Sequence, residues 1–192
     1  ILITYKYAVT NGKNKLRNHH LPGLLPDGVP KNLKDTVHPF NYGDFEKLKK
    51  ICKKYKLAAI KMEVGRNSLP NQDFLKKIRK FATKNKIVLI FDECTSGFRR
   101  NLGGLHMTQK IYPDMCMFGK ALGNGYAITA VIGKKDIMDK AKNSFISSTF
   151  WTERIGFLAG IRTIEVMKKI KSWEKIIKNG KYLSEKIKKL AK

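Results

Sequence analysis

The feature that most constrains the fold is an alternation of short, mainly apolar runs with amphipathic segments. The apolar runs have the length and composition of strands that are buried on both faces; they are residues 58–64, 87–92, 115–119 and 127–132. The amphipathic segments repeat apolar residues at helical spacing; they are residues 43–56, 71–85, 153–170 and 173–190. Strands that alternate with helices favour an α/β fold with a mostly parallel sheet flanked by helices. Weaker signals predict short strands at 36–40 and 145–149 and a loop over 11–35.

The charge balance is strongly basic, with 40 Lys and Arg against 15 Asp and Glu and a formal charge of +25. This excess keeps a basic nucleic-acid-binding domain open as an alternative function. However, seven of the 40 are Arg and 33 are Lys, whereas Arg is the residue that contacts bases and phosphates in bidentate fashion. The Lys-rich balance therefore favours a solvated basic surface, and nucleic acid is not the expected partner.

The three cysteines, Cys52, Cys94 and Cys116, are far apart in the sequence. Their spacing supports neither a disulfide framework nor a metal site, and it favours a reducing compartment such as the cytoplasm. Apolar runs fall well short of the roughly 20 residues of a membrane span, so no membrane partner is expected. The opening segment 1–5 resembles the interior of a strand, from which we expect the chain to be part of a longer protein.

Polar residues at the strand ends are the candidates for chemistry, because ligands of open α/β sheets bind beyond the carboxyl ends of the strands. Asp92 directly follows the apolar run 87–91. A carboxylate at this place can bind Mg²⁺ or pair with a cationic ring nitrogen of a cofactor. It can also serve only as a helix cap or a loop salt bridge, and Asp92 alone does not separate these possibilities.

Lys120 ends another apolar run and enters the glycine-rich turn 119–125. A lysine in such a place suits Schiff-base chemistry. A phosphate-binding P-loop is excluded, because Ala121 stands where that motif needs Ser or Thr. Thr149 lies in a hydroxyl-rich segment before a predicted helix, where it can bind phosphate. The alternative is that the segment only caps the helix, with Thr152 as the capping residue. A carboxylate, a lysine and a hydroxyl cluster together match the needs of pyridoxal phosphate.

The stretch from Phe91 to Gly125 resembles the class III (omega) aminotransferases, which are fold-type I pyridoxal phosphate enzymes. The branch looks similar to that of glutamate-semialdehyde aminomutase and its sugar-modifying relatives. The resemblance rests on motifs that occur in the family's order: Phe91-Asp92-Glu93, Gly97-Phe98-Arg99, Gly103-Gly104, Pro113-Asp114 and Gly119-Lys120. Further matches are Leu21-Pro22-Gly23-Leu24, Met62-Glu63 with Arg66-Asn67, and Thr149-Phe150.

The resemblance implies roles for five residues. Lys120 would be the catalytic residue and would form a Schiff base with the cofactor aldehyde. Asp92 would keep the cofactor's ring nitrogen protonated, and Cys94 would pack on the ring face where the family usually has Val. Thr149 would contact the cofactor phosphate, usually across a homodimer interface, and Asn67 would lie near the ring hydroxyl. We expect Lys120 and Asp92 to project into one crevice.

The expected function is therefore a pyridoxal 5′-phosphate-dependent aminotransferase or aminomutase. Its substrate would be a small amino and keto compound or an amino aldehyde. The alternatives are a non-catalytic remnant of the same fold and the basic nucleic-acid-binding domain. By the same resemblance, residues 1–192 would be part of the large cofactor-binding domain, without its N-terminal part and without the C-terminal small domain.

Overall fold

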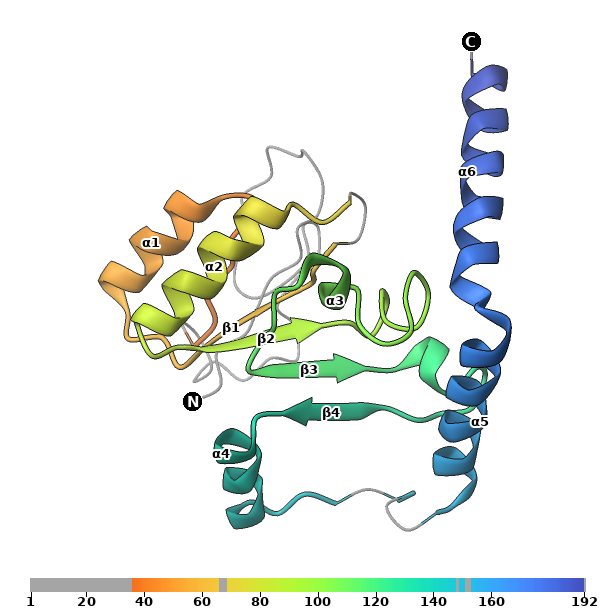
Figure 1. Cartoon of the computed structure of the whole chain (residues 1–192). Coiled ribbons are helices and arrows are strands. Elements are labelled where there is room, and N and C mark those ends of the chain that lie inside the picture. The colour runs from red at the N-terminus through yellow and green to blue at the C-terminus, as the bar shows by residue number, and fades with distance from the viewer. Residues whose placement is uncertain (1–35, 66–68, 148, 151–152, 192) are drawn as a thin grey trace, which may run out of the picture. The chain divides into compact units, whose positions relative to one another are not determined.

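The computed structural model describes residues 36–65, 69–147, 149–150 and 153–191. It divides the chain into two compact units, residues 1–92 with 111–116 and residues 93–110 with 117–192. The hydrogen-bonded strands follow one another in the order β1-β2-β3-β4 (Figure 1). Their bounds are β1 Ala59–Met62, β2 Val88–Asp92, β3 Met115–Phe118 and β4 Ala130–Gly133.

In the first unit, β1 and β2 form the parallel pair at the centre of a small core. The register pairs Ala59 with Val88 and Met62 with Phe91. Leu89 and Phe91 are completely buried, as expected for a strand covered on both faces. The packing and pairing of β2 therefore fix the position of Asp92 at its end.

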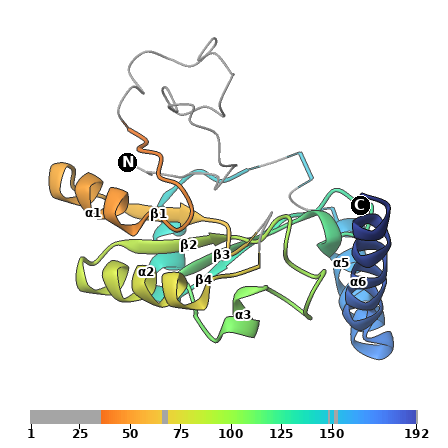
Figure 2. The ribbon, with the colours of Figure 1, turned by 90° about the horizontal axis from the view of Figure 1, so that it is seen from above.

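Two amphipathic helices, α1 (Phe45–Lys54) and α2 (Gln72–Lys84), pack against each other beside this pair (Figures 1 and 2). Each helix begins at a side-chain cap. The Asp44 carboxylate accepts a hydrogen bond from the backbone N–H of Lys47, and the Asn71 amide oxygen accepts one from that of Phe74. Such caps satisfy N–H groups that have no partner within the helix. The two helices also meet through an edge-on contact between Phe45 and Phe81.

Asp114 fixes the start of β3 beside β2. Its backbone N–H donates to the Leu89 carbonyl at 2.8 Å, and its carboxylate accepts from the Leu89 N–H at 2.8 Å. The same carboxylate oxygen pairs with Arg79 Nη1 of α2 at 2.9 Å. Four residues after Leu89 and just past the end of β2, the Glu93 N–H donates to the Met117 carbonyl. Because both pairings advance in the same direction, β3 runs parallel to β2.

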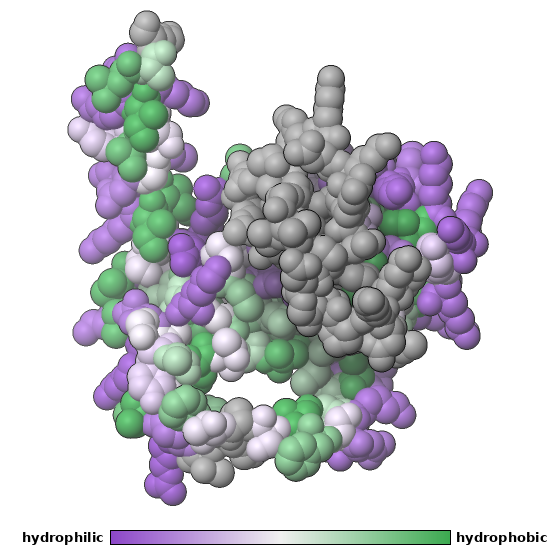
Figure 3. Space-filling view, turned by 180° about the vertical axis from the view of Figure 1, so that it is seen from behind, coloured by the Kyte–Doolittle hydropathy of each residue, from purple (hydrophilic) through white to green (hydrophobic). Residues whose placement is uncertain are grey.

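The second unit holds the end of β3, the 3₁₀ turn η2 (Lys120–Leu122) and β4, whose arrow points opposite to that of β3 in Figure 1. Short helical segments follow: α4 Lys135–Met138 and η3 Asp139–Asn143. Two long helices then end the described chain, α5 (Ile155–Ile170) and α6 (Ser172–Leu190). Apolar and hydrophilic side chains alternate along α6, and none of its residues is buried (Figure 3). No helix in the described ranges is long and apolar enough to cross a membrane.

The structure confirms the four main strands, the helices and the mostly parallel sheet that the sequence predicts. The strand predicted at 36–40 is wrong, because residues 37–40 have no regular structure although Phe40 is buried. The strand predicted at 145–149 is also wrong for its described residues, of which Phe145 is 98% exposed. At both places the prediction depended on apolar composition alone, which does not show whether a neighbouring strand is available for pairing. The predicted loop at 11–35 lies outside the described residues.

The Asp114 contacts lead to a prediction about stability. Replacing Asp114 with Ala removes the acceptor for the buried Leu89 N–H and the ion-pair partner of Arg79. We expect the free energy of unfolding in urea to fall by about 2–3 kcal/mol, the cost of leaving buried polar groups unpaired.

The matched control is Glu46→Ala, because Glu46 is 72% exposed and pairs with Lys49 within one helix. Such surface pairs contribute at most about 1 kcal/mol. Equal losses of stability in the two variants would contradict the assigned role of Asp114.

Candidate functional site

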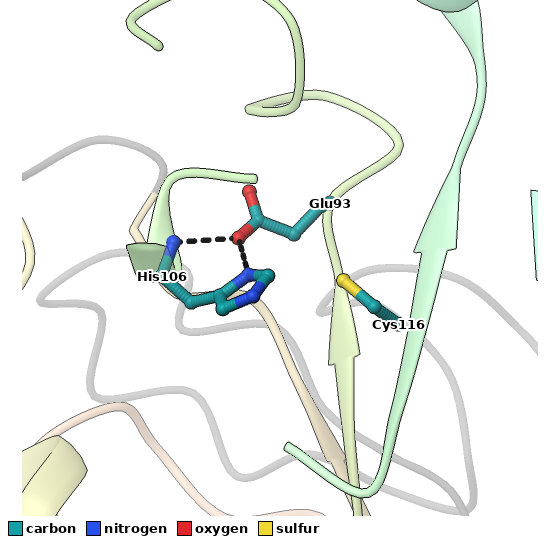
Figure 4. A group of neighbouring side chains, drawn as sticks. All are labelled: Glu93, His106 and Cys116. Atoms are coloured by element: carbon teal, nitrogen blue, oxygen red, sulfur yellow. Dashed lines mark hydrogen bonds and ion pairs between the residues drawn. The ribbon is translucent and has the colours of Figure 1, made fainter. Parts of the chain in front are cut away.

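The segment that follows β2, residues 93–110, is a loop that ends in the short helix α3 (His106–Gln109). It is organised around one buried carboxylate, that of Glu93, which is 0% exposed. Glu93 accepts hydrogen bonds from the backbone N–H groups of Leu105 at 2.9 Å and His106 at 2.8 Å. The Ser96 hydroxyl also donates to it. The ring nitrogen Nδ1 of His106 lies 2.8 Å from the same carboxylate, as Figure 4 shows. The two ends of the loop are thus tied to a single side chain.

These hydrogen bonds determine the charge of Glu93. Burial alone would raise the pKa of the carboxyl group. The hydrogen bonds from His106, Ser96 and Leu105 together lower the pKa by more than burial raises it, so the net shift is downward. A carboxylate that accepts several hydrogen bonds is stabilised in its charged form. Glu93 is therefore an anion at neutral pH.

Two glycines of the loop are required by close contacts. A Cβ atom on Gly104 would lie 2.4 Å from His106 Nδ1, and one on Gly97 would lie 2.7 Å from the Phe118 ring. No other residue fits at either place without displacing its neighbours. The glycines quoted in the family resemblance thus have a physical reason in this chain.

The second unit also places Lys120, directly after β3. Its backbone is left-handed, with φ of +46°, and its side chain is exposed. Lys120 Nζ donates a hydrogen bond to Thr95 Oγ1 of the Glu93 loop at 2.7 Å. Cys94 lies behind the preceding glycine, because a Cβ on Gly119 would be 3.6 Å from Cys94 Sγ. The structure therefore brings Lys120, Thr95 and Cys94 together.

Lys120 lines a hollow of about 910 Å³ in the second unit. Polar groups around it include Arg99, Asn124, Tyr126 and Arg162, and α5 supplies apolar groups such as Met167. Sites for small molecules and cofactors commonly have volumes of about 300–1,000 Å³ with a few polar groups on an apolar lining. Lys120 is part of this lining, and the primary amine of a lysine can react with a carbonyl compound.

Asp92 belongs to the first unit, where its carboxylate pairs with Lys61 Nζ of β1 at 3.0 Å. Both side chains are mostly buried, at 17% and 16% exposed. The predicted crevice shared by Asp92 and Lys120 stays a prediction.

The remaining predicted site residues are less informative. Thr149 belongs to the second unit and is exposed, and its predicted contact with the cofactor phosphate stays a prediction. Asn67 lies outside the described residues.

Sequence reasoning did not single out Lys61 or Thr95. For Lys61 a signal was present in the sequence, because it is the one lysine in the apolar run 58–64. A charged group on a buried strand needs a partner of opposite charge. Thr95 carried no comparable signal, because its contact with Lys120 joins residues 25 positions apart.

The Glu93 anchor leads to a prediction about pH. Its pKa in the folded protein is lowered from an ordinary value of 4.5, so its stabilising effect is fully present above that pH and is lost as the pH falls through the folded pKa. Glu93→Gln should lower the free energy of unfolding at pH 7 by about 2–3 kcal/mol. The difference from the parent protein should shrink below about pH 4.5, as urea unfolding at several pH values would show.

Glu165→Gln is the control, because Glu165 forms an exposed pair with Arg162 within α5. It should change stability by less than about 1 kcal/mol. A Glu93→Gln difference that stayed constant from pH 7 to pH 3 would mean that the Glu93 charge does not stabilise the loop.

Comparison with known proteins gives consistent matches. The sequence profile described as Aminotransferase class-III matches residues 57–192. The 3-aminobutyryl-CoA aminotransferase of Cloacimonas acidaminovorans is 33% identical over 93% of this chain and 47% of that protein. The glutamate-1-semialdehyde 2,1-aminomutase of Sulfolobus acidocaldarius is 36% identical over 74% of this chain and 36% of that protein. The chain thus spans less than half the length of these relatives.

Among solved structures, the acetylornithine aminotransferase of Elizabethkingia anophelis aligns with a TM-score of 0.73 at 26% identity. The alignment covers 82% of this chain and 43% of that one. These neighbours confirm the fold expected from the resemblance, and the family indicates pyridoxal phosphate as its cofactor. The profile match includes the Glu93 loop, the end of β3 and Lys120. The chain therefore belongs to the class III aminotransferase family.

Proposed function

We propose that the protein is a pyridoxal-phosphate-dependent aminotransferase or aminomutase that acts on small amino compounds. The observation that carries the proposal is the placement of Lys120 in a class III chain: it lies just after β3, it lines the hollow of about 910 Å³, and its amine is hydrogen-bonded to Thr95. The transferase and isomerase relatives support the two reaction types. An amino compound with a keto compound, or an amino aldehyde, fits either type.

The residues present fit the cofactor. Lys120 offers a primary amine for the aldehyde, and Asp92 offers an anionic carboxylate for a cationic ring nitrogen. Arg99 and Arg162 on the hollow offer positive charge for anionic groups. Cys94, Thr149 and Asn67 are proposed cofactor contacts on the strength of the family resemblance. When it is bound, the cofactor supplies an electron sink that stabilises negative charge on a substrate carbon.

The chain's own groups would then carry out proton movements. Asp92 would hold a proton on the ring nitrogen, because an anion beside that nitrogen favours its protonated form. The amine of Lys120, once released by the substrate amine, would move a proton between the substrate Cα and the cofactor C4′.

Organisation and location form a further part of the proposal. Residues 1–192 would be part of a larger cofactor-binding domain, which the coverage of less than half of the relatives supports. The protein would work as a homodimer in the cytoplasm. The three free cysteines support a reducing compartment, since paired thiols are typical of oxidising ones. Neither nucleic acid nor membrane is proposed as a partner.

The test is reductive trapping with pyridoxal phosphate. Purified protein is mixed with the cofactor, reduced with borohydride and digested, and the modified lysine is located by mass spectrometry. We expect the cofactor on Lys120, and Lys120→Ala should abolish that adduct and the visible absorbance of the bound cofactor. Asp92→Asn should leave the adduct but slow proton removal from the substrate.

Lys110→Ala is a matched control, because Lys110 is also exposed and also has a left-handed backbone, with φ of +54°. It should leave both signals intact. An adduct of normal yield in Lys120→Ala would overturn the assignment of the Schiff-base lysine.

A further inference from the structure

We propose that the hydroxyl group of Thr95 is a positioning residue for the amine of Lys120, holding it in place before it reacts and after it is released. This inference rests on the proposed function, because it assumes that Lys120 is the reactive lysine. Its basis is the hydrogen bond of 2.7 Å from Lys120 Nζ to Thr95 Oγ1.

Thr95 is held in a fixed place by the Glu93 loop. The residue after it, Ser96, donates to the Glu93 carboxylate, and the Gly97 N–H donates to the Glu93 carbonyl at 2.8 Å. A short turn thus closes around Thr95, whose side chain is half-buried. Glu93 also accepts hydrogen bonds from Leu105 and His106. The Thr95 hydroxyl therefore belongs to a turn that several hydrogen bonds hold in place.

Lys120, in contrast, has a long side chain and lines a wide hollow. Ordering a lysine side chain costs up to about 2 kcal/mol of rotamer entropy, so an untethered amine would sample much of that space. A fixed hydrogen-bond partner lowers this cost at the moment of reaction, because the amine is already in one place.

A hydroxyl group suits a lysine that must change its protonation state. It can accept a hydrogen bond from an ammonium group and can donate one to a neutral amine, so the contact persists in both forms. A carboxylate in the same place would favour the ammonium form and oppose the neutral amine that attacks a carbonyl carbon. Thr95 therefore orients the amine without holding it in its unreactive charged form.

The test measures the rate at which each lysine of the purified protein is trapped by pyridoxal phosphate and borohydride over a range of pH. In Thr95→Val, the rate at Lys120 should fall about five- to tenfold, the fold-change that corresponds to one hydrogen bond. Thr95→Ser keeps a hydroxyl and should restore most of the rate. The rates at the exposed lysines 110, 134 and 135 should not change, which separates lost positioning from general unfolding.

Thr83→Val is the matched control, because the Thr83 hydroxyl donates to the Arg79 carbonyl of its own helix, α2, and Thr83 does not line the hollow. It should leave the rate at Lys120 unchanged. If Lys120 is trapped at the same rate in Thr95→Val and in the parent protein, the role of Thr95 is overturned while the proposed function stands. If Lys120 is not trapped in the parent protein, the proposed function itself fails.

Discussion

The candidate site depends on the hydrogen bonds that the buried carboxylate of Glu93 accepts. This carboxylate is inaccessible to solvent, and its donors are Ser96, Leu105 and His106, which lie toward both ends of one loop. A buried anion is stable only where it is fully paired, so this loop has one favourable arrangement. That arrangement places Cys94 behind Gly119 and Thr95 within hydrogen-bond distance of the Lys120 amine.

The site combines a fixed backbone with a long side chain. The backbone of Lys120 follows β3 and begins the turn η2, and the amine at the end of the side chain is hydrogen-bonded to Thr95. Lysine chemistry on a cofactor needs this combination, because the amine must bond to a carbon, leave it and then carry a proton. Under the proposed function, Thr95 would hold the amine by its hydrogen bond between these events.

Much of the fold could be predicted from the sequence, because apolar runs and helical periodicity report burial directly. The strand 87–92 with its terminal Asp92, and the strand 115–119 with Lys120 at its end, are the clearest examples. The strands predicted at 36–40 and 145–149 were wrong, since an apolar run does not reveal whether a neighbouring strand is available for pairing. The Lys61–Asp92 pair and the Thr95–Lys120 bond could not be predicted, because each depends on how segments far apart in the sequence approach one another.

The most direct test of the account is an experimental structure of the protein crystallised with pyridoxal phosphate. We expect continuous electron density from Lys120 Nζ to the cofactor, the Asp92 carboxylate within hydrogen-bond distance of the ring nitrogen, and the Glu93 loop in the arrangement described above. Density that joined the cofactor to a different lysine, or a cofactor bound away from the carboxyl ends of β2 and β3, would contradict it.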